Sequence, residues 1–170
     1  MELWSHNRPK QKFYLCDQPK TFHMANDTLS IQRILRASPE QVYRACTERD
    51  ALAFWLPPYG YTCLVDDMDV RIDGAFHMTF VNFLTGQRHP FGGKYLDLKP
   101  NEFIRHTDEF DDALMITSIS IKKVSVGTEL TIVEEGLPAN MTPEMCLLGW
   151  QESLEKLATL VEPKKPSVAQ

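Results

Sequence analysis

The chain contains no run of about 18 apolar residues, so we expect no segment of it to span a membrane. Positive charge is also scarce, since 18 Lys and Arg stand against 23 Asp and Glu and leave a net charge of -5. That balance disfavours nucleic acid and anionic membranes as partners. A continuous apolar core and a small-residue cleavage site are both missing from the N-terminal stretch MELWSHNRPKQKFYL. We therefore expect no signal peptide and a cytoplasmic location.

Motifs that hold metals or phosphates are missing too. The cysteines form no CxxC pair and no regular framework, and we interpret them as reduced, packed thiols: Cys16, Cys46, Cys63 and Cys146. No HxH, HExxH or paired Cys/His spacing exists, so we expect no metal. Gly92-Gly93 lies in a strand context, not before a helix, and GxSxG is absent. The sequence therefore predicts no cofactor and gives little support to nucleophilic catalysis.

The composition that remains is that of one globular domain. Hydrophobic residues make up 43% of the 170 positions and charged residues 24%, enough to bury a core without disulfides. We place the domain at residues 27–162, between an N-terminal arm (1–26) and a C-terminal tail (163–170). The arm carries several apolar residues and is a candidate to cover the domain or to form a homodimer contact: Trp4, Phe13, Tyr14, Leu15 and Phe22.

The clearest periodic pattern lies near the C-terminus, in TPEMCLLGWQESLEKLATLVE (residues 142–162). Thr142 can cap a helix there, and Pro143 suits its first position. Apolar residues then recur at spacings of three and four, which predicts one apolar stripe: Leu147, Trp150, Leu154, Leu157 and Val161. Gly149 costs about 1 kcal/mol against alanine in such a helix. Either Gly149 allows close packing, or Gly149 and Ser153 leave room for a ligand.

Before that helix the apolar period is mostly two, which predicts an antiparallel sheet. Two short helices follow the first strand, one capped by Ser38 with Gln41 three residues on and one ended by Pro57-Pro58. We expect strands over residues 27–37, 61–72, 75–84, 89–98, 103–110, 114–124 and 128–134. The expected fold class is α+β: a curved antiparallel sheet of about seven strands wrapped around the long C-terminal helix, with a cavity between them.

Five segments in this order resemble a known family: ASPEQVYRACTERDALAFWLPP, DVRIDGAFHMTF, GGKYLDLKPNEFIRHTDEF, GTELTIVEEG and GWQESLEKLATLVE. They are similar to the helix-grip fold of the SRPBCC superfamily (START, birch-pollen-allergen, polyketide cyclase), in the branch related to the activator of the heat-shock-protein-90 ATPase. The resemblance implies an apolar ligand held between sheet and helix. It also implies that a few members are cyclases or aromatases and that some contact the chaperone, so the fold alone does not settle the function.

One face of the strand over residues 75–83 is the candidate cavity wall, with Asn82 as a polar handle. Gly93, on the next strand, either opens space or marks a bulge. Trp55 stands before Pro57-Pro58 and is a candidate for the mouth of the pocket. The residues expected to contact a ligand are Trp55, Phe76, Met78, Phe80, Asn82, Phe91, Tyr95, His106, Gly149, Trp150, Ser153 and Leu154.

His106 and Asp108 fall on one face of a strand, where they could form a base-and-orienter pair. The acidic residues that follow, Glu109, Asp111 and Asp112, favour instead a solvated surface pair. His106 and Asn82 are the candidate proton-handling or oxyanion groups.

We expect the protein to bind a small apolar or aromatic molecule, with Asn82, Tyr95 and His106 orienting its polar ends. A cyclase, aromatase or hydrolase that uses the same cavity is the first alternative. A chaperone co-factor that acts through protein contact is the second.

Overall fold

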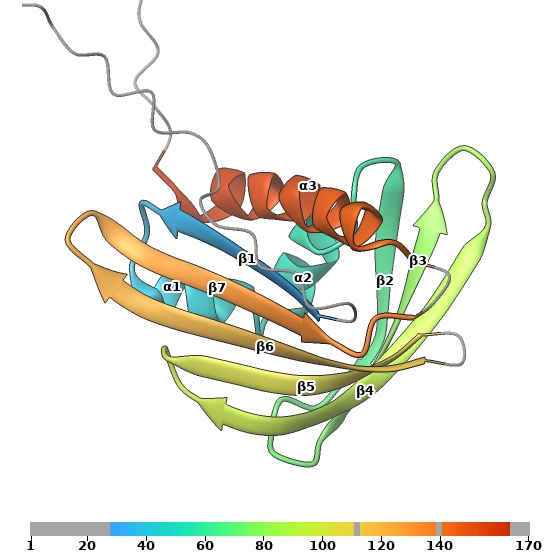
Figure 1. The fold of residues 1–170 in the computed structure, drawn as a ribbon, viewed down its shortest axis with the longest axis horizontal. Helices are drawn as coiled ribbons and strands as arrows, with labels where there is room; N and C mark the ends of the chain where they lie inside the picture. Colours follow the sequence, from blue (N-terminus) through green and yellow to red (C-terminus); the bar gives the residue numbers. More distant parts are fainter. Residues whose placement is uncertain (1–27, 111–112, 139–140, 164–170) are drawn as a thin grey trace, which may run out of the picture.

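The computed structural model describes residues 28–110, 113–138 and 141–163. Seven antiparallel strands form one sheet in the order β1-β7-β6-β5-β4-β3-β2. The sheet curves around the long helix α3 (Pro143–Val161), which crosses its concave side (Figure 1). The strand bounds are β1 Thr28–Leu35, β2 Tyr61–Met68, β3 Ala75–Asn82, β4 Arg88–Lys99, β5 Phe103–Phe110, β6 Ala113–Val124 and β7 Gly127–Glu135. The α+β helix-grip architecture predicted from the sequence is confirmed.

The helices begin where the capping residues predict. Ser38 and Gln41 form a capping box at the start of α1 (Pro39–Ala45), in which each side chain bonds the other's backbone N–H. The second short helix, α2 (Arg49–Trp55), follows directly. Thr142 accepts a hydrogen bond from the Met145 N–H at 3.3 Å and so caps α3. Each of these local signals was correct because a cap depends on residues a few positions apart.

The turn between β2 and β3 is longer than the sequence predicts. We expected a strand to Ile72, but β2 ends at Met68, and residues 69–74 form the turn. Asp73 adopts a φ of 63° there, and a Cβ at Gly74 would lie 2.1 Å from the Asp69 carbonyl oxygen. The turn needs both the positive φ and the missing Cβ, so it takes up residues that the alternating pattern alone assigned to the strand.

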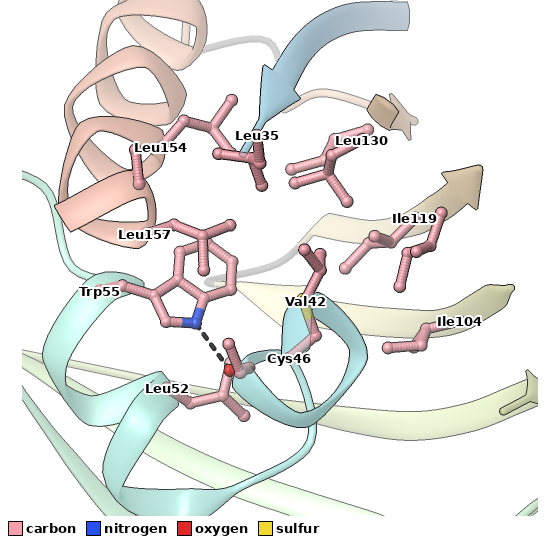
Figure 2. Close-up of a cluster of buried hydrophobic side chains, with 14 of the residues drawn as sticks. Leu35, Val42, Cys46, Leu52, Trp55, Ile104, Ile119, Leu130, Leu154 and Leu157 are labelled. Atoms are coloured by element: carbon pink, nitrogen blue, oxygen red, sulfur yellow. Dashed lines mark hydrogen bonds between the residues drawn. The ribbon is translucent and has the colours of Figure 1, made fainter. Parts of the chain in front are cut away.

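The core fills the space beneath the C-terminal half of α3. Leu154 and Leu157 pack there with Trp55, which is fully buried (Figure 2). The Trp55 indole N–H donates to the Ala45 carbonyl oxygen at 2.7 Å, so the buried polar edge of this ring is satisfied. Since α1 and α2 contact both α3 and the sheet, they close this end of the fold. The N-terminal half of α3 is left facing the sheet across open space.

Several predictions concern residues outside the described ranges: the N-terminal arm, its proposed homodimer contact, the C-terminal tail and Cys16. Within the described ranges, no helix combines the length and apolar character needed to cross a lipid bilayer.

Candidate ligand-binding cavity

A cavity of about 390 Å³ lies between the sheet and the N-terminal half of α3. Its wall is built from strands β2 to β7 and from α2 and α3, together with residues just after α1, just after α2 and just before α3. This volume is in the range of small-molecule sites. All of the residues that the sequence predicted as ligand contacts line this cavity except Asn82 and Leu154. That these residues contact a ligand stays a prediction.

One wall is aromatic. Phe76, Met78 and Phe80 alternate along β3, so their side chains share the concave face. The ring of Phe80 lies 4.7 Å from that of Phe91 on β4, measured between centroids. The rings of Phe76 and Tyr95 are 5.5 Å apart. These strands therefore offer a continuous apolar surface to anything that enters the cavity.

Gly149 lies beside open space, which agrees with the interpretation that this glycine leaves room for a ligand and not with close packing. A Cβ built at Gly149 meets no atom within 4 Å, although the residue lines the cavity. Ser153, one turn later, also lines the cavity, but its hydroxyl is engaged by backbone. It lies 2.7 Å from the Leu56 carbonyl oxygen and 2.9 Å from that of Gly149. The open space is therefore at Gly149, and Ser153 ties α3 to the segment after α2.

Asn82 and Leu154 lie elsewhere, and both placements are corrections. The Asn82 side-chain carbonyl accepts from the Leu84 and Thr85 N–H groups, each at 3.0 Å, because β3 ends at Asn82 and a turn begins. Leu154 is only 2% exposed and packs in the core, since the apolar stripe of α3 passes from cavity to core along its length.

Gly93 also differs from both expectations, because it neither opens space nor marks a bulge. A Cβ at Gly93 would lie 1.7 Å from the Thr107 carbonyl oxygen and 3.0 Å from the Phe76 ring. The register of β4 against β5 shifts further along, between Tyr95 and Asp97. The missing side chain at Gly93 therefore lets the β5 backbone approach closely.

A row of polar side chains crosses the aromatic floor of the cavity. Tyr95 on β4 pairs with His106 on β5, His106 pairs with Thr117 on β6, and Thr117 pairs with Glu134 on β7. All four line the cavity. We call Tyr95, His106, Thr117 and Glu134 the polar row. Antiparallel pairing places directly opposite side chains on one face of a sheet, which explains why residues so far apart in sequence share this line.

The His106–Asp108 pair is inside the cavity and not on the surface, so the preference for a solvated pair was wrong. His106 Nδ1 lies 3.1 Å from Asp108 Oδ2, and their side chains are 16% and 12% exposed. Thr117 Oγ1 donates to the same Asp108 oxygen at 2.6 Å. Asp108 shares the inward face of β5 with Ile104 and His106, whereas the next acidic residue, Glu109, is exposed. Because side chains alternate along β5, Asp108 faces the cavity while Glu109 is exposed.

Glu134 ends the polar row beneath α3. The Trp150 indole N–H donates to Glu134 Oε2 at 3.0 Å. The pKa of Glu134 is raised to about 7, mainly by burial; the Trp150 hydrogen bond and His106 oppose the rise, and Asp108 contributes to it. Burial alone lowers the pKa of His106, but the charge and hydrogen bond of Asp108 outweigh burial, and its net pKa is raised. The row thus combines a carboxyl that titrates near neutrality with a histidine whose pKa is raised.

Sequence reasoning missed Asp108, Thr117 and Glu134 as members of the cavity wall. For Glu134 a signal exists: it continues the inward alternation of Leu130 and Ile132 along β7, so an ionisable group stands where the pattern calls for an apolar one. Thr117 occupies an equivalent position in β6. No local pattern gives the register that aligns these residues across β5, β6 and β7.

The buried thiols offer no nucleophile. Cys46, Cys63 and Cys146 are free and buried, as expected of packed thiols. Burial raises the pKa of Cys46 to about 12 and those of Cys63 and Cys146 to about 11. Within the described part of the chain, no three His, Cys, Asp or Glu side chains are arranged to hold a metal ion.

A curved antiparallel sheet that grips a long C-terminal helix over a mainly apolar cavity defines a helix-grip protein of the SRPBCC class. The family model described as activator of Hsp90 ATPase homolog 1-like protein matches residues 36–162. The chain therefore belongs to this family, as the motifs in the sequence suggested.

Solved structures agree with this placement. A crystal structure from Chromobacterium violaceum is 51% identical to this chain and covers 81% of it and 99% of its own length, with a TM-score of 0.79. Structures from Rhodobacter sphaeroides and Nitrosomonas europaea are 19% and 22% identical, with TM-scores of 0.71 and 0.65, and cover 82% and 81% of this chain and 95% and 96% of their own. At those identities they support the fold alone. No similar sequence was found among curated proteins.

Proposed function

We propose that this protein binds a small, mainly apolar or aromatic molecule in the cavity between the sheet and α3. The observation that carries the proposal is the open space at Gly149 opposite the aromatic wall of β3 and β4. A helix that only sealed a core would gain stability from a side chain at this position, since glycine costs about 1 kcal/mol against alanine inside a helix. The missing side chain is what keeps the cavity open.

The wall is sufficient for useful affinity. Burying one large apolar side chain against a ligand contributes about 1.5–3 kcal/mol, and a Kd of about 1 μM needs about 8 kcal/mol. A naphthalene-sized ligand gains about 4.5–9 kcal/mol from three such contacts with Phe76, Phe80 and Phe91, and the other apolar residues of the wall must offset the entropy of association. The polar row would orient the polar end of the ligand.

The test is a matched pair of substitutions at Gly149. Calorimetry measures how tightly each variant binds the neutral probe 2-naphthalenemethanol. Gly149→Phe should fill the open space and weaken binding at least tenfold. Gly149→Ala improves the helix propensity at least as much as Gly149→Phe but adds little volume, so it should bind within about threefold of the wild type. Both variants should melt at or above the wild-type temperature, which separates loss of binding from loss of fold. A wild type that does not bind the probe, or a Gly149→Phe variant that binds it equally well, contradicts the proposal.

The His106–Asp108 pair supports a second candidate, acid–base catalysis on the bound molecule. Asp108 accepts from Nδ1, which fixes the proton there and leaves Nε2 as the base. With 1-(2-naphthyl)propan-2-one in D₂O, Nε2 would take a proton from the carbon beside the carbonyl, and the enolate would regain a deuteron. NMR should show exchange above the buffer rate that is lost in His106→Ala. Equal exchange with and without protein excludes this role.

The chaperone contact implied by the family description gains no support from the described residues and stays a prediction.

A further inference from the structure

We infer that the ligand of this cavity carries a basic amine, and that the amine binds over Thr117 between Asp108 and Glu134. This inference rests on the proposed function, because it names the chemical class of the molecule that the cavity takes. It depends on three observations: the charge of the cavity wall, the hydrogen-bond acceptors left open in it, and a tyrosine hydroxyl that faces the cavity without a hydrogen bond to a described residue.

The charge of the wall is one-sided. Asp108 and Glu134 are 8% and 9% exposed and both line the cavity. Among the described residues of the wall there is no Lys or Arg, and His89 and His106 are the only basic side chains. An anionic ligand would meet two carboxyls with no permanent cation to offset them. A cationic head group would compensate the buried acidic groups, which are costly to leave unpaired.

The hydrogen bonds of the two carboxyls are also incomplete. Asp108 Oδ2 accepts from both His106 and Thr117, and Glu134 Oε2 accepts from Trp150. The other oxygen of each carboxyl has no hydrogen bond to a described residue, although a carboxylate can accept about four. Thr117 lies between them on β6, with its own proton already donated to Asp108. These open oxygens can accept hydrogen bonds from a bound ammonium, which supplies three donors.

Tyr95 shows that the polar row is not completed by protein. It is 3% exposed and lines the cavity, yet no described residue hydrogen-bonds its hydroxyl. Burial raises its pKa, so the hydroxyl keeps its proton. The hydroxyl is therefore open to the cavity, where a polar atom of the ligand can hydrogen-bond it.

Proton release gives a second readout. The ionisable groups around Glu134 are His106 and Asp108 on β5 and Cys146 on α3, with the Trp150 N–H as the donor to Glu134. Because the pKa of Glu134 is raised to about 7, a large share of this carboxyl is neutral at pH 7. An ammonium that pairs with Glu134 favours the carboxylate and displaces that proton. Binding of an amine should therefore release protons, whereas binding of an alcohol should not.

The experiment compares three probes of one shape on the full chain at pH 7: 2-naphthalenemethylamine, 2-naphthalenemethanol and 2-naphthoate. Calorimetry should give the tightest Kd for the amine, at least tenfold below that of the alcohol, and the weakest for the carboxylate. Repeating the amine titration in buffers of different ionisation enthalpy should show net proton release. Glu134→Gln keeps an acceptor for Trp150 and should reduce the amine-to-alcohol preference at least fivefold. Glu135→Gln, an exposed neighbour on the opposite face, is the matched control and should leave the preference unchanged.

The outcomes separate the two claims. If none of the probes binds the wild type, the proposed function itself fails. If amine and alcohol bind equally, or the carboxylate binds most tightly, the amine inference is overturned while the cavity keeps its role. If the amine preference survives in Glu134→Gln, or is lost equally in Glu135→Gln, the placement of the amine beside Glu134 is wrong.

Discussion

At the scale of the residue, Glu134 has an unusual environment among the residues that the structure describes. It is a buried carboxyl at the end of an apolar strand pattern, held by one indole N–H and close to another acid. Such a group costs stability when it is charged. Perturbed carboxyls inside cavities are often functional, because the same environment that raises the pKa also strengthens the interaction with a bound partner.

The stability of the fold should record this cost. The pKa of Glu134 is about 7 in the folded protein, above the ordinary 4.5 of an unfolded chain, so the folded state binds the proton more tightly. Its contribution is fully present below pH 4.5 and is lost as the pH rises through 7. Relative to Glu134→Gln, the wild type should lose up to about 3 kcal/mol of unfolding free energy between pH 4.5 and 8. The unfolding free energy of both proteins is measured in urea across this pH range. If it changes equally with pH in the two proteins, the pKa of Glu134 is not raised.

His106 should report on its partner. Burial lowers the pKa of His106, and the carboxylate of Asp108 is the largest of the contributions that raise it. In Asp108→Asn the pKa of His106 should therefore fall below its wild-type value, as followed by the ring-proton shift in NMR. Asp67→Asn is the control, because Asp67 lies beside the exposed His77 and should leave His106 unchanged. An unaltered titration of His106 in Asp108→Asn would mean that the pair is not formed in solution.

At the scale of the element, α3 has two halves with different tasks. Leu154 and Leu157 anchor its second half in the core, while Gly149 and Trp150 face the cavity from the first half. The sequence predicted the helix, its cap and the open position, because each depends on spacing within a few residues. It could not divide the stripe between core and cavity, since that division depends on where α1 and α2 close the fold.

The same limit applies to the sheet. Alternation located every strand, with errors confined mainly to strand ends such as the one at Met68. The polar row depends instead on the register of four strands, which is set by pairing between distant residues. Glu134 was therefore not recognised as part of a site, and the His106–Asp108 pair was assigned to the surface. Asn82 was assigned inward because the turn that takes it away begins at that residue.

Two glycines should respond in opposite ways to the same substitution. Gly93→Ala would place a Cβ 1.7 Å from the Thr107 carbonyl oxygen and should cost about 2 kcal/mol or more of stability. Gly149→Ala meets no atom and should stabilise α3 by up to about 1 kcal/mol. Thermal or urea unfolding of both variants measures this directly. Equal effects at the two positions would contradict the contrast between a close strand approach and an open cavity.

At the scale of the whole molecule, the sheet and α3 form a rigid frame around one mainly apolar chamber. The family and the 51% identical structure establish that frame. The individual chemistry comes from the side chains that the frame brings together, above all the polar row and Asp108. A small molecule should therefore enter the cavity and bind against the polar row and Asp108.

Methionine-methyl NMR tests this claim most directly, because the methionines mark the chamber from several sides. Met78, Met115, Met141 and Met145 line the cavity, whereas Met68 does not. Titration with 2-naphthalenemethylamine should shift the methyl signals of the four lining residues along one binding curve and leave Met68 in place. Signals that do not move, or that move only at Met68, would contradict binding in the cavity.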